Sequence, residues 1–212
     1  MGKQPPFRLI LASASPARRE LLTRAGLTFE VQPADIDEPT GAGFTDARTY
    51  VAWVAWLKAA AVAGRVAAGA EPAWVLAADT VGWLRGNVIG KPADEADARR
   101  ILRSLSGTEH ELWTGVCLWR RTGDVQVAWQ ELSRVVMRPL TDAELDAYLQ
   151  TRQWQGCSGA YAIQEGTDPY LRVVEGSVSN VIGLPMESTL QLLRWLAGPT
   201  FPDTQTVEQK IR

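Results

Sequence analysis

The hydrophobic and polar positions of this chain follow two patterns. Short apolar runs bounded by turn residues predict buried strands, and longer runs joined by a Gly-containing turn predict hairpins. The expected strands cover residues 7–12, 28–31, 74–78 and 173–174, and the expected hairpins cover residues 81–89 and 111–136. Segments with a helical period and a capping residue predict helices. The expected helices cover residues 16–25, 45–63, 94–105, 142–150 and 186–196.

Because strands and helices interleave while hairpins are also present, we expect an α/β fold with a mixed, twisted sheet and flanking helices. A length of 212 residues suits one domain, which can have two lobes. We therefore expect residues 1–212 to form a single domain, with a polar and loosely ordered tail from about residue 199.

Composition excludes several classes of protein. The formal net charge is -2, so no overall basic field attracts nucleic acid. The two cysteines, Cys117 and Cys157, form no CxxC motif, which fits a reducing compartment. The N-terminus lacks the apolar core of a signal peptide. The hydrophobic segment 50–70 contains Lys58 and Arg65, which make it too polar for a membrane span. We expect a cytoplasmic protein that binds neither membrane nor nucleic acid.

The chain contains nine tryptophans, a high number. Most fall in periodic segments, where packing in the core or on a strand face is the common role. RNA binding through a Trp-rich surface is the alternative, and the net charge and the lack of a basic stripe disfavour it.

The first chemical motif is the turn from Ser13 to Arg19, which follows an apolar run. Ser15 is expected to cap a helix that begins at Pro16. A strand, a tight turn and a helix N-terminus together form an anion site, which Ser13, Ser15 and Arg18 would strengthen. A plain helix cap with surface arginines is an equally good interpretation of this segment alone.

Carboxylates form the second motif. Asp79 ends the apolar run 74–78, where a carboxylate usually faces a cleft and can bind metal or act as a base. Glu38 and Asp37 supply hard oxygen ligands of the kind that Mg²⁺ and Mn²⁺ prefer. The alternatives are a turn residue for Asp79 and a solvated acidic loop for the other two.

Two lysines complete the candidate charges. The helix 45–63 carries Lys58 at the border of its apolar face, from which it can reach a cleft. That face consists of Tyr50, Trp53, Val54, Leu57 and Ala61. The segment ending at Lys91 is no P-loop, because only three residues separate its glycines and Pro92 follows the lysine. Lys91 is still able to bind phosphate as a point charge.

Gln164 and His110 are the remaining candidates. The amide of Gln164 both donates and accepts, which suits reading the edge of a base, although it is equally typical of an exposed strand end. His110 is the only histidine, which excludes His-rich zinc sites and HExxH, and we expect it to be structural or a peripheral substrate contact. Cations and hydroxyls suit a polyanion, and carboxylates beside them suit a metal and an activated water. The set indicates hydrolysis of a phosphoanhydride.

Together these segments resemble the Maf family of nucleoside triphosphate pyrophosphatases. The resemblance runs in order from about residue 9 to residue 196. The matching stretches are Leu11–Leu22, Ile36–Glu38, Lys58-Ala59, Ala78-Asp-Thr-Val81, Gly90-Lys-Pro92, Leu105–His110, Thr114-Gly115, Gly159–Gln164 and Asn180–Pro185. Each stretch is weak by itself, but the ordered set is very specific.

The resemblance implies a mixed α/β fold with two lobes around a central cleft and, for many members, a homodimer. It implies metal-dependent cleavage between the α and β phosphates, with Mg²⁺ or Mn²⁺ held by Glu38 and Asp79. By motif position Asp79 is the catalytic acid/base, with Glu38, Lys58 and Lys91 as further catalytic residues. The residues expected to bind substrate are Ser13, Ser15, Arg18, Thr80 and Gln164.

The resemblance also implies a base preference. Thr80 and Gln164 match the branch that prefers dTTP and UTP, and modified pyrimidine nucleotides are further candidate substrates. Ala17 departs from that branch, which usually has Arg there, so Ala17 is the specificity position and a 7-methyl-GTP pyrophosphatase is the alternative. A nucleotide-binding septum regulator with little catalysis is a second alternative, disfavoured by the retained Asp79 and Lys58.

Overall fold

The computed structural model describes residues 8–41, 43–66, 73–120, 124–163, 168–198 and 201. The strands are β1 (Arg8–Leu11), β2 (Glu30–Val31), β3 (Ala73–Leu84), β4 (Asn87–Ile89), β5 (Glu109–Arg120), β6 (Val125–Met137) and β7 (Leu171–Glu175). The helices are α1 (Pro16–Arg24), α2 (Ala47–Arg65), α3 (Glu95–Leu105), α4 (Asp142–Gln150), the 3₁₀ turn η1 (Ser158–Ala160), α5 (Val178–Ile182) and α6 (Met186–Ala197).

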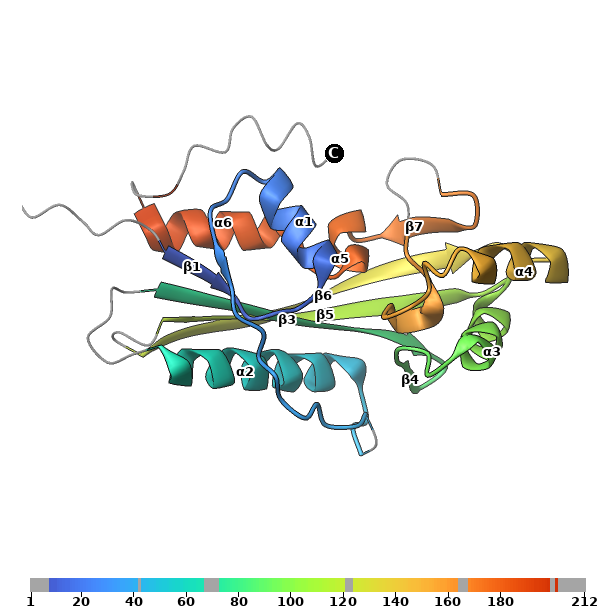
Figure 1. Ribbon diagram of the computed structural model, residues 1–212, viewed down its shortest axis with the longest axis horizontal. Helices are drawn as coiled ribbons and strands as arrows, with labels where there is room; N and C mark the ends of the chain where they lie inside the picture. The colour runs from blue at the N-terminus through green and yellow to red at the C-terminus, as the bar shows by residue number, and fades with distance from the viewer. Residues whose placement is uncertain are drawn as a thin grey trace, which may run out of the picture.

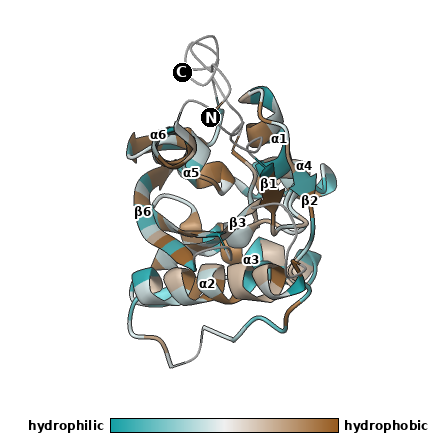
Figure 2. Cartoon of the chain, turned by 90° about the vertical axis from the view of Figure 1, so that its left-hand side faces the viewer, coloured by the Kyte–Doolittle hydropathy of each residue, from teal (hydrophilic) through white to brown (hydrophobic). Residues whose placement is uncertain are grey.

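The seven strands form one sheet with the order β2-β1-β3-β5-β6-β7, and β4 pairs with β3. β1 is parallel to both β2 and β3, and the other pairs are antiparallel. α2 covers one face of the sheet, and α1, α5 and α6 cover the other, while α3 and α4 lie at one end (Figure 1). The end-on view in Figure 2 shows the same three layers. The predicted mixed α/β fold is confirmed.

Most element predictions are confirmed, because the local signals are also the ones that the structure uses. Ser15 caps α1 with Pro16 as its first residue, and Thr141 opens α4 with a complete capping box. The hairpins β3–β4 and β5–β6 form as expected. Gln164 and almost all of the predicted tail lie outside the described residues.

β3 differs from the sequence prediction in a way that defines the site. A strand was expected to end at residue 78, with Asp79 at its carboxyl end, and this is wrong. β3 continues for twelve residues because β5 pairs with it from Trp74 to Trp83 without a break. On its other edge, β1 pairs with residues 73–76 and β4 pairs with residues 82–84. Within the described chain, residues 77–81 therefore have no strand neighbour on that edge.

Two apolar layers fill the space on either side of the sheet. Alternate residues of β1 show the division: Leu9 and Leu11 pack toward α1 and α6, whereas Ile10 packs toward α2. A third cluster under α3 and α4 closes the end of the sheet around Leu102 and Leu149. All of these residues are fully or almost fully buried, so the sheet is a rigid base for the site.

The packed face of α2 is rotated from the predicted one. Trp53 was expected to face the core, but it is 46% exposed and stacks on Trp56, with ring centroids 5.3 Å apart. The buried stripe instead runs through Val51, Val54 and Lys58. The larger tryptophans stay outside because the sheet lies too close to α2 for them. No helix among the described residues is long and apolar enough to cross a membrane.

Gly115 explains this close approach. It lies opposite Asp79 in the β3–β5 pair and faces α2. A Cβ atom at position 115 would lie 2.3 Å from the carbonyl oxygen of Val51, a distance that real atoms do not tolerate. The absence of a side chain at Gly115 therefore lets α2 pack directly on the sheet.

We predict that Gly115→Ala destabilises the protein by about 3 kcal/mol or more, because the methyl group must displace backbone of α2. Gly64→Ala is the matched control, since a Cβ there meets nothing within 4 Å. The control should gain about 0.5–1 kcal/mol from helix propensity. Urea unfolding of both variants measures the difference, and equal stabilities would contradict the close-packing argument.

Candidate active site

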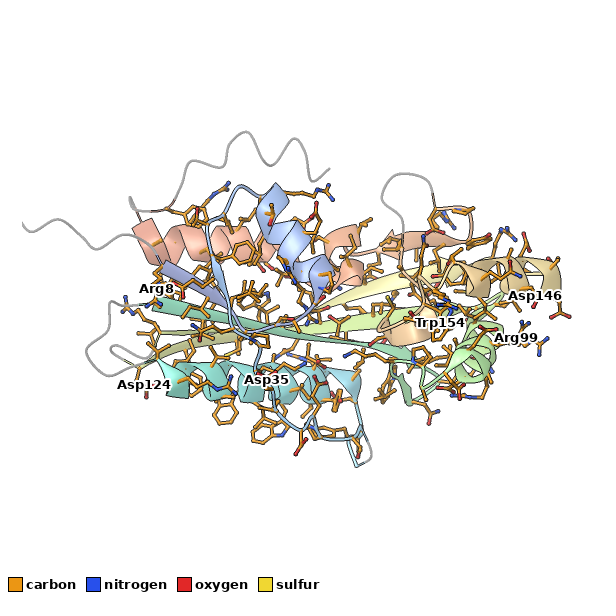
Figure 3. All side chains as sticks on the ribbon, in the orientation of Figure 1. Arg8, Asp35, Arg99, Asp124, Asp146 and Trp154 are labelled. Atoms are coloured by element: carbon orange, nitrogen blue, oxygen red, sulfur yellow. The ribbon has the colours of Figure 1, made fainter. Side chains whose placement is uncertain are left out.

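A cavity of about 830 Å³ opens at the unpaired edge of β3. The end of β1 and the start of α1 form one wall, and the segment between β2 and α2 forms another. Lys91 follows β4, and the η1 region and α5 complete the lining. The cavity lies where β1 stops and β4 has not yet begun. In Figure 3, Asp35 marks the segment between β2 and α2, whereas Arg99 and Asp146 mark the remote end formed by α3 and α4.

The charged centre of the cavity is an ammonium group held between two carboxylates. Lys58 Nζ lies 2.7 Å from Asp79 Oδ1 and 2.8 Å from Glu38 Oε1. Lys58 and Asp79 are only 7% and 6% exposed, so each requires the other as a partner. The predicted grouping of Glu38, Lys58 and Asp79 in one cleft is thus observed. Asp37 does not line the cavity.

Glu38 is held in place from α2. Arg65 donates to the carbonyl oxygens of Pro33 and Ala34, at 2.8 and 2.5 Å, and fastens the start of the acidic segment. The Tyr50 hydroxyl donates to the Pro39 carbonyl oxygen at 3.0 Å and fastens its end. One helix therefore supplies the ammonium and positions the carboxylate that it binds.

The pKa values report this charge distribution. Burial acts to raise the pKa of Glu38, but the hydrogen bond and charge of Lys58, helped by Lys91 and Arg18, outweigh it and leave the pKa below its ordinary value. Burial raises the pKa of Tyr50 to about 12, and the negative charges of Asp79 and Glu38 add to this effect. Glu38 is therefore ionised at neutral pH, next to a tyrosine that stays protonated.

Arg18 is buried at the opposite wall of the cavity. Its Nε donates to the carbonyl oxygen of Gly183 at 2.7 Å, and its two terminal nitrogens donate to Ser13 Oγ at 3.2 Å and Thr80 Oγ1 at 3.1 Å. Burial lowers the pKa of Arg18, although Asp79 and Glu38 oppose the shift, and a guanidinium in a protein stays charged. The expected neighbours Ser13, Arg18 and Thr80 thus form one hydrogen-bonded group.

The N-terminal turn of α1 also lines the cavity. Ser15 accepts from the backbone N–H of Arg18, which is the capping bond, and both the cap and the anion-site interpretations fit this geometry. Ala17 lines the cavity without a charged group, and Arg19 does not line it. Arg19 therefore does not replace the guanidinium that Ala17 lacks.

A second compartment of the cavity is apolar. Its walls come from β5, from the segment after η1 and from α5, and they are Leu112, Tyr161, Ala162, Ile163, Val181 and Ile182. Gln164, expected to read the base, directly follows this wall in the chain, but it lies outside the described residues. One cavity thus combines charged groups with apolar surface.

A buried pair supports this compartment. His110 Nε2 and the Tyr161 hydroxyl lie 2.7 Å apart, and both residues are buried. His110 does not line the main cavity. Of its two expected roles, structural residue and peripheral substrate contact, this geometry fits the structural one. Burial lowers the pKa of His110 to about 4, so the imidazole is neutral at physiological pH.

The carboxylates fit a divalent metal ion. Lys58 binds Glu38 Oε1 and Asp79 Oδ1, and among the described residues the second oxygen of each carboxylate has no hydrogen bond or ion pair. No group of three or more His, Cys, Asp or Glu side chains able to hold a metal occurs in that part of the chain. Mg²⁺ typically binds one or two carboxylates together with substrate phosphates and waters, which this pair can satisfy.

Fold and site together define an α/β protein with a cavity suited to a phosphorylated ligand. A family model described as Maf-like protein matches residues 8–196, so the chain belongs to the Maf family. It is 48% identical over 198 residues to a dTTP/UTP pyrophosphatase of Anaeromyxobacter sp. (strain Fw109-5), with 91% of each chain covered. It is 43% identical over 194 residues to a dTTP/UTP pyrophosphatase of Rhodopirellula baltica, covering 91% of this chain and 83% of the other.

A solved structure has a related fold. The structure of a HAM1 protein from Coxiella burnetii aligns with a TM-score of 0.50 and covers 90% of this chain and 98% of its own. At 16% identity this likeness concerns the fold alone.

Sequence reasoning missed several residues that organise the site. Thr114 and Asn180 belong to stretches that match the family, but no local pattern reveals that Thr114 bonds Thr80 and that Asn180 bonds Thr114. Gly183 has φ of +127°, and the carbonyl of this residue anchors Arg18. The sequence offers one signal for Gly183: the Gly-Leu-Pro sequence after α5 is typical of a helix end.

We predict that His110 makes folding stability depend on pH. The pKa of His110 is about 4 in the folded protein and near 6.5 in the unfolded chain, so the unfolded chain binds a proton that the folded one rejects. This contribution is complete above the unfolded value and is lost as the pH falls toward the folded value. Between pH 7 and pH 5 it amounts to about 2 kcal/mol.

Urea unfolding of wild type and His110→Gln at both pH values measures this contribution. The variant removes the titrating group but keeps an amide that can bind the Tyr161 hydroxyl. Wild type should lose more stability on acidification than the variant, and parallel losses would exclude a neutral buried His110.

Proposed function

We propose that this chain hydrolyses dTTP and UTP to the nucleoside monophosphate and pyrophosphate. The observation that carries the proposal is the buried Asp79–Lys58–Glu38 group beside an apolar compartment in one cavity. The names of the relatives, dTTP/UTP pyrophosphatase, support the substrate class. We also propose that residues 1–212 form one domain, since all strands among the described residues belong to a single sheet.

The phosphate groups are proposed to bind at the α1 wall. Three of the five N–H groups of Arg18 are used by Gly183, Ser13 and Thr80, which leaves two for phosphate oxygens. The backbone N–H of Ala17 adds a donor at the start of α1, since Pro16 has none and those of Arg18 and Arg19 bond to Ser15, and Lys91 adds a charge. Ser13 and Ser15 orient the turn that carries them.

Charge balance supports a metal ion in this reaction. The charged residues that line the cavity are Arg18, Arg24, Lys58, Lys91, Glu20, Asp35, Glu38 and Asp79, which sum to zero. Lys58 is already neutralised by Glu38 and Asp79, so the protein alone offers little net positive charge to a triphosphate. Glu38 and Asp79 would hold Mg²⁺ or Mn²⁺. When bound, the metal supplies Lewis-acid stabilisation of the charge on the α-phosphoryl group.

Asp79 is proposed as the general base. The oxygen of a water forms a bond to the α-phosphorus, the bond from the α-phosphorus to the α–β bridging oxygen breaks, and pyrophosphate leaves. The proton of the water passes to the Asp79 carboxylate. Lys58 holds one oxygen of Asp79 and thereby directs the other toward the cavity.

The apolar compartment is proposed to hold the base. Tyr161, Leu112 and Val181 offer flat apolar surface to a pyrimidine ring. Thr80 provides a polar contact at its border, and Gln164 is proposed to supply a second. Ala17 leaves room where a guanidinium would otherwise lie.

We predict that Asp79→Asn lowers kcat by about 100-fold or more, because the amide cannot accept the proton. The substitution keeps the shape of the side chain, so circular dichroism should show an unchanged fold. Asp146→Asn is the control: Asp146 pairs with Arg99 at the remote end of the sheet and should leave kcat unaltered. A near-normal rate for Asp79→Asn would remove Asp79 from the base role.

We predict that pyrophosphate release is fastest with dTTP and UTP and requires Mg²⁺ or Mn²⁺. The measurement compares dTTP, UTP, CTP, GTP and 7-methyl-GTP, each with metal and with chelator. Preference for 7-methyl-GTP would refute the base assignment but keep the chemistry. Absence of turnover on every nucleotide would refute the chemistry.

A further inference from the structure

A chain of hydrogen bonds links the cavity to the buried interior on the α5 side of the sheet. Thr80 Oγ1 lies 3.1 Å from Arg18 Nη2 and 2.9 Å from Thr114 Oγ1. Thr114 Oγ1 lies 3.1 Å from the carbonyl oxygen of Asn180, which is fully buried. Thr80 and Thr114 face each other in the β3–β5 pair, so the sheet itself sets their spacing.

The two ends of this chain determine its direction. A guanidinium only donates, so Thr80 Oγ1 must accept from Arg18. A carbonyl only accepts, so Thr114 must donate its single hydrogen to Asn180. Thr114 Oγ1 can then only accept from Thr80. Each hydroxyl has one hydrogen, and both hydrogens are used inside the protein.

A second arrangement of these hydrogens is disfavoured. The Thr80 hydroxyl can instead donate to the Gly183 carbonyl oxygen at 3.4 Å. This bond is longer, and its acceptor already receives a hydrogen bond from Arg18 at 2.7 Å. Thr114 would then donate its hydrogen to Thr80, which leaves the buried carbonyl oxygen of Asn180 without a donor. In neither arrangement does Thr80 keep a hydrogen for a ligand, and only the first leaves it a lone pair with which to accept from one, because in the second it accepts from both Arg18 and Thr114.

We propose that Thr114 is a positioning residue that fixes the polarity of Thr80, so that Thr80 presents only an acceptor to the base. Thr80 is partly exposed and lines the cavity, whereas Thr114 is fully buried and cannot touch the substrate. The Ser158 hydroxyl donates to the backbone carbonyl of Thr80 at 2.9 Å and so attaches the η1 region to the same strand.

The consequence is a choice between pyrimidines of the same size. Thymine and uracil carry an N3–H donor, which an acceptor-only Thr80 satisfies. Cytosine carries an unprotonated N3, which leaves two acceptors facing each other. Such a mismatch is penalised more than a missing contact, because both groups lose water without gaining a bond. The inference rests on the proposed hydrolysis of dTTP and UTP.

Thr114→Val tests the inference. Valine keeps the shape of threonine but offers no acceptor, so the hydrogen of Thr80 is left with only the long, shared contact to the Gly183 carbonyl and can be donated to cytosine N3 instead. The quantity to measure is the ratio of kcat/KM for UTP to that for CTP, with metal present. Both values come from one sample, so the ratio does not depend on the fraction of folded protein.

The ratio should fall at least 10-fold in Thr114→Val. Thr114→Ser restores the hydroxyl and should keep the ratio close to that of wild type. A second variant, Thr80→Val, removes the acceptor itself and should lower kcat/KM for UTP about 10-fold more than for CTP. This variant tests the proposed contact between Thr80 and the base even if Thr114→Val folds poorly.

The outcomes separate this inference from the proposed function. A wild-type protein that hydrolyses UTP and CTP equally well, or a Thr114→Val ratio within about threefold of wild type, would overturn the polarity argument and leave the hydrolysis intact. A fall in the ratio for Thr114→Ser equal to that for Thr114→Val would also overturn it, because loss of packing would then be the cause. A wild-type protein without turnover on any nucleotide refutes the proposed function instead.

Discussion

The contact of α2 with the sheet at Gly115 determines the charged half of the site. Because no side chain separates the helix from the strand there, Lys58 reaches Asp79 across the packed layer. The same helix fastens the acidic segment through Tyr50 and Arg65 and so brings Glu38 to the same ammonium. A buried ion pair contributes little to stability when its desolvation is counted, which makes a functional role the better explanation for its presence. The geometry of the reacting groups is thus a consequence of helix-on-sheet packing.

The unpaired edge of β3 explains why adjacent residues can serve different purposes. Successive side chains of a strand point to opposite faces, so Asp79 faces α2 and Thr80 faces α5. In a fully paired sheet these two would be separated by the strand. Here β1 ends before them and β4 begins after them, so one cavity extends around the edge and reaches both. The ion group of Lys58, Asp79 and Glu38 lies on the α2 side of the strand, whereas Arg18 and the apolar lining from α5 lie on the other side, so one cavity presents both to a ligand.

The sequence predicts which residues are candidates for the site better than it predicts the strands and contacts around them. Asp79 follows a clear apolar run, and Lys58 lies beside an apolar helix face, so both can be found locally. The run could not reveal that β3 continues past Asp79, because that continuation depends on pairing with β5, about forty residues away in the sequence. Trp53 was assigned to the core from its hydrophobicity alone, whereas the sheet lies too close to α2 to admit it. Thr114 in a strand and Asn180 in the short helix α5 carry no local signal, since their role depends on contacts with distant residues.

Arg18 connects the two sides of the cavity and links an early segment of the chain to a late one. Its Nε bonds a carbonyl near the C-terminal helices, and its terminal nitrogens bond the turn after β1 and the central strand. These acceptors are neutral, so the guanidinium keeps its full charge for a ligand while its orientation is determined on three sides. Asp79 and Glu38 are close enough to affect its pKa but form no ion pair with it, because Lys58 occupies them. The protein thus uses one cation to position the carboxylates and keeps another, rigidly oriented, which we propose binds the phosphates.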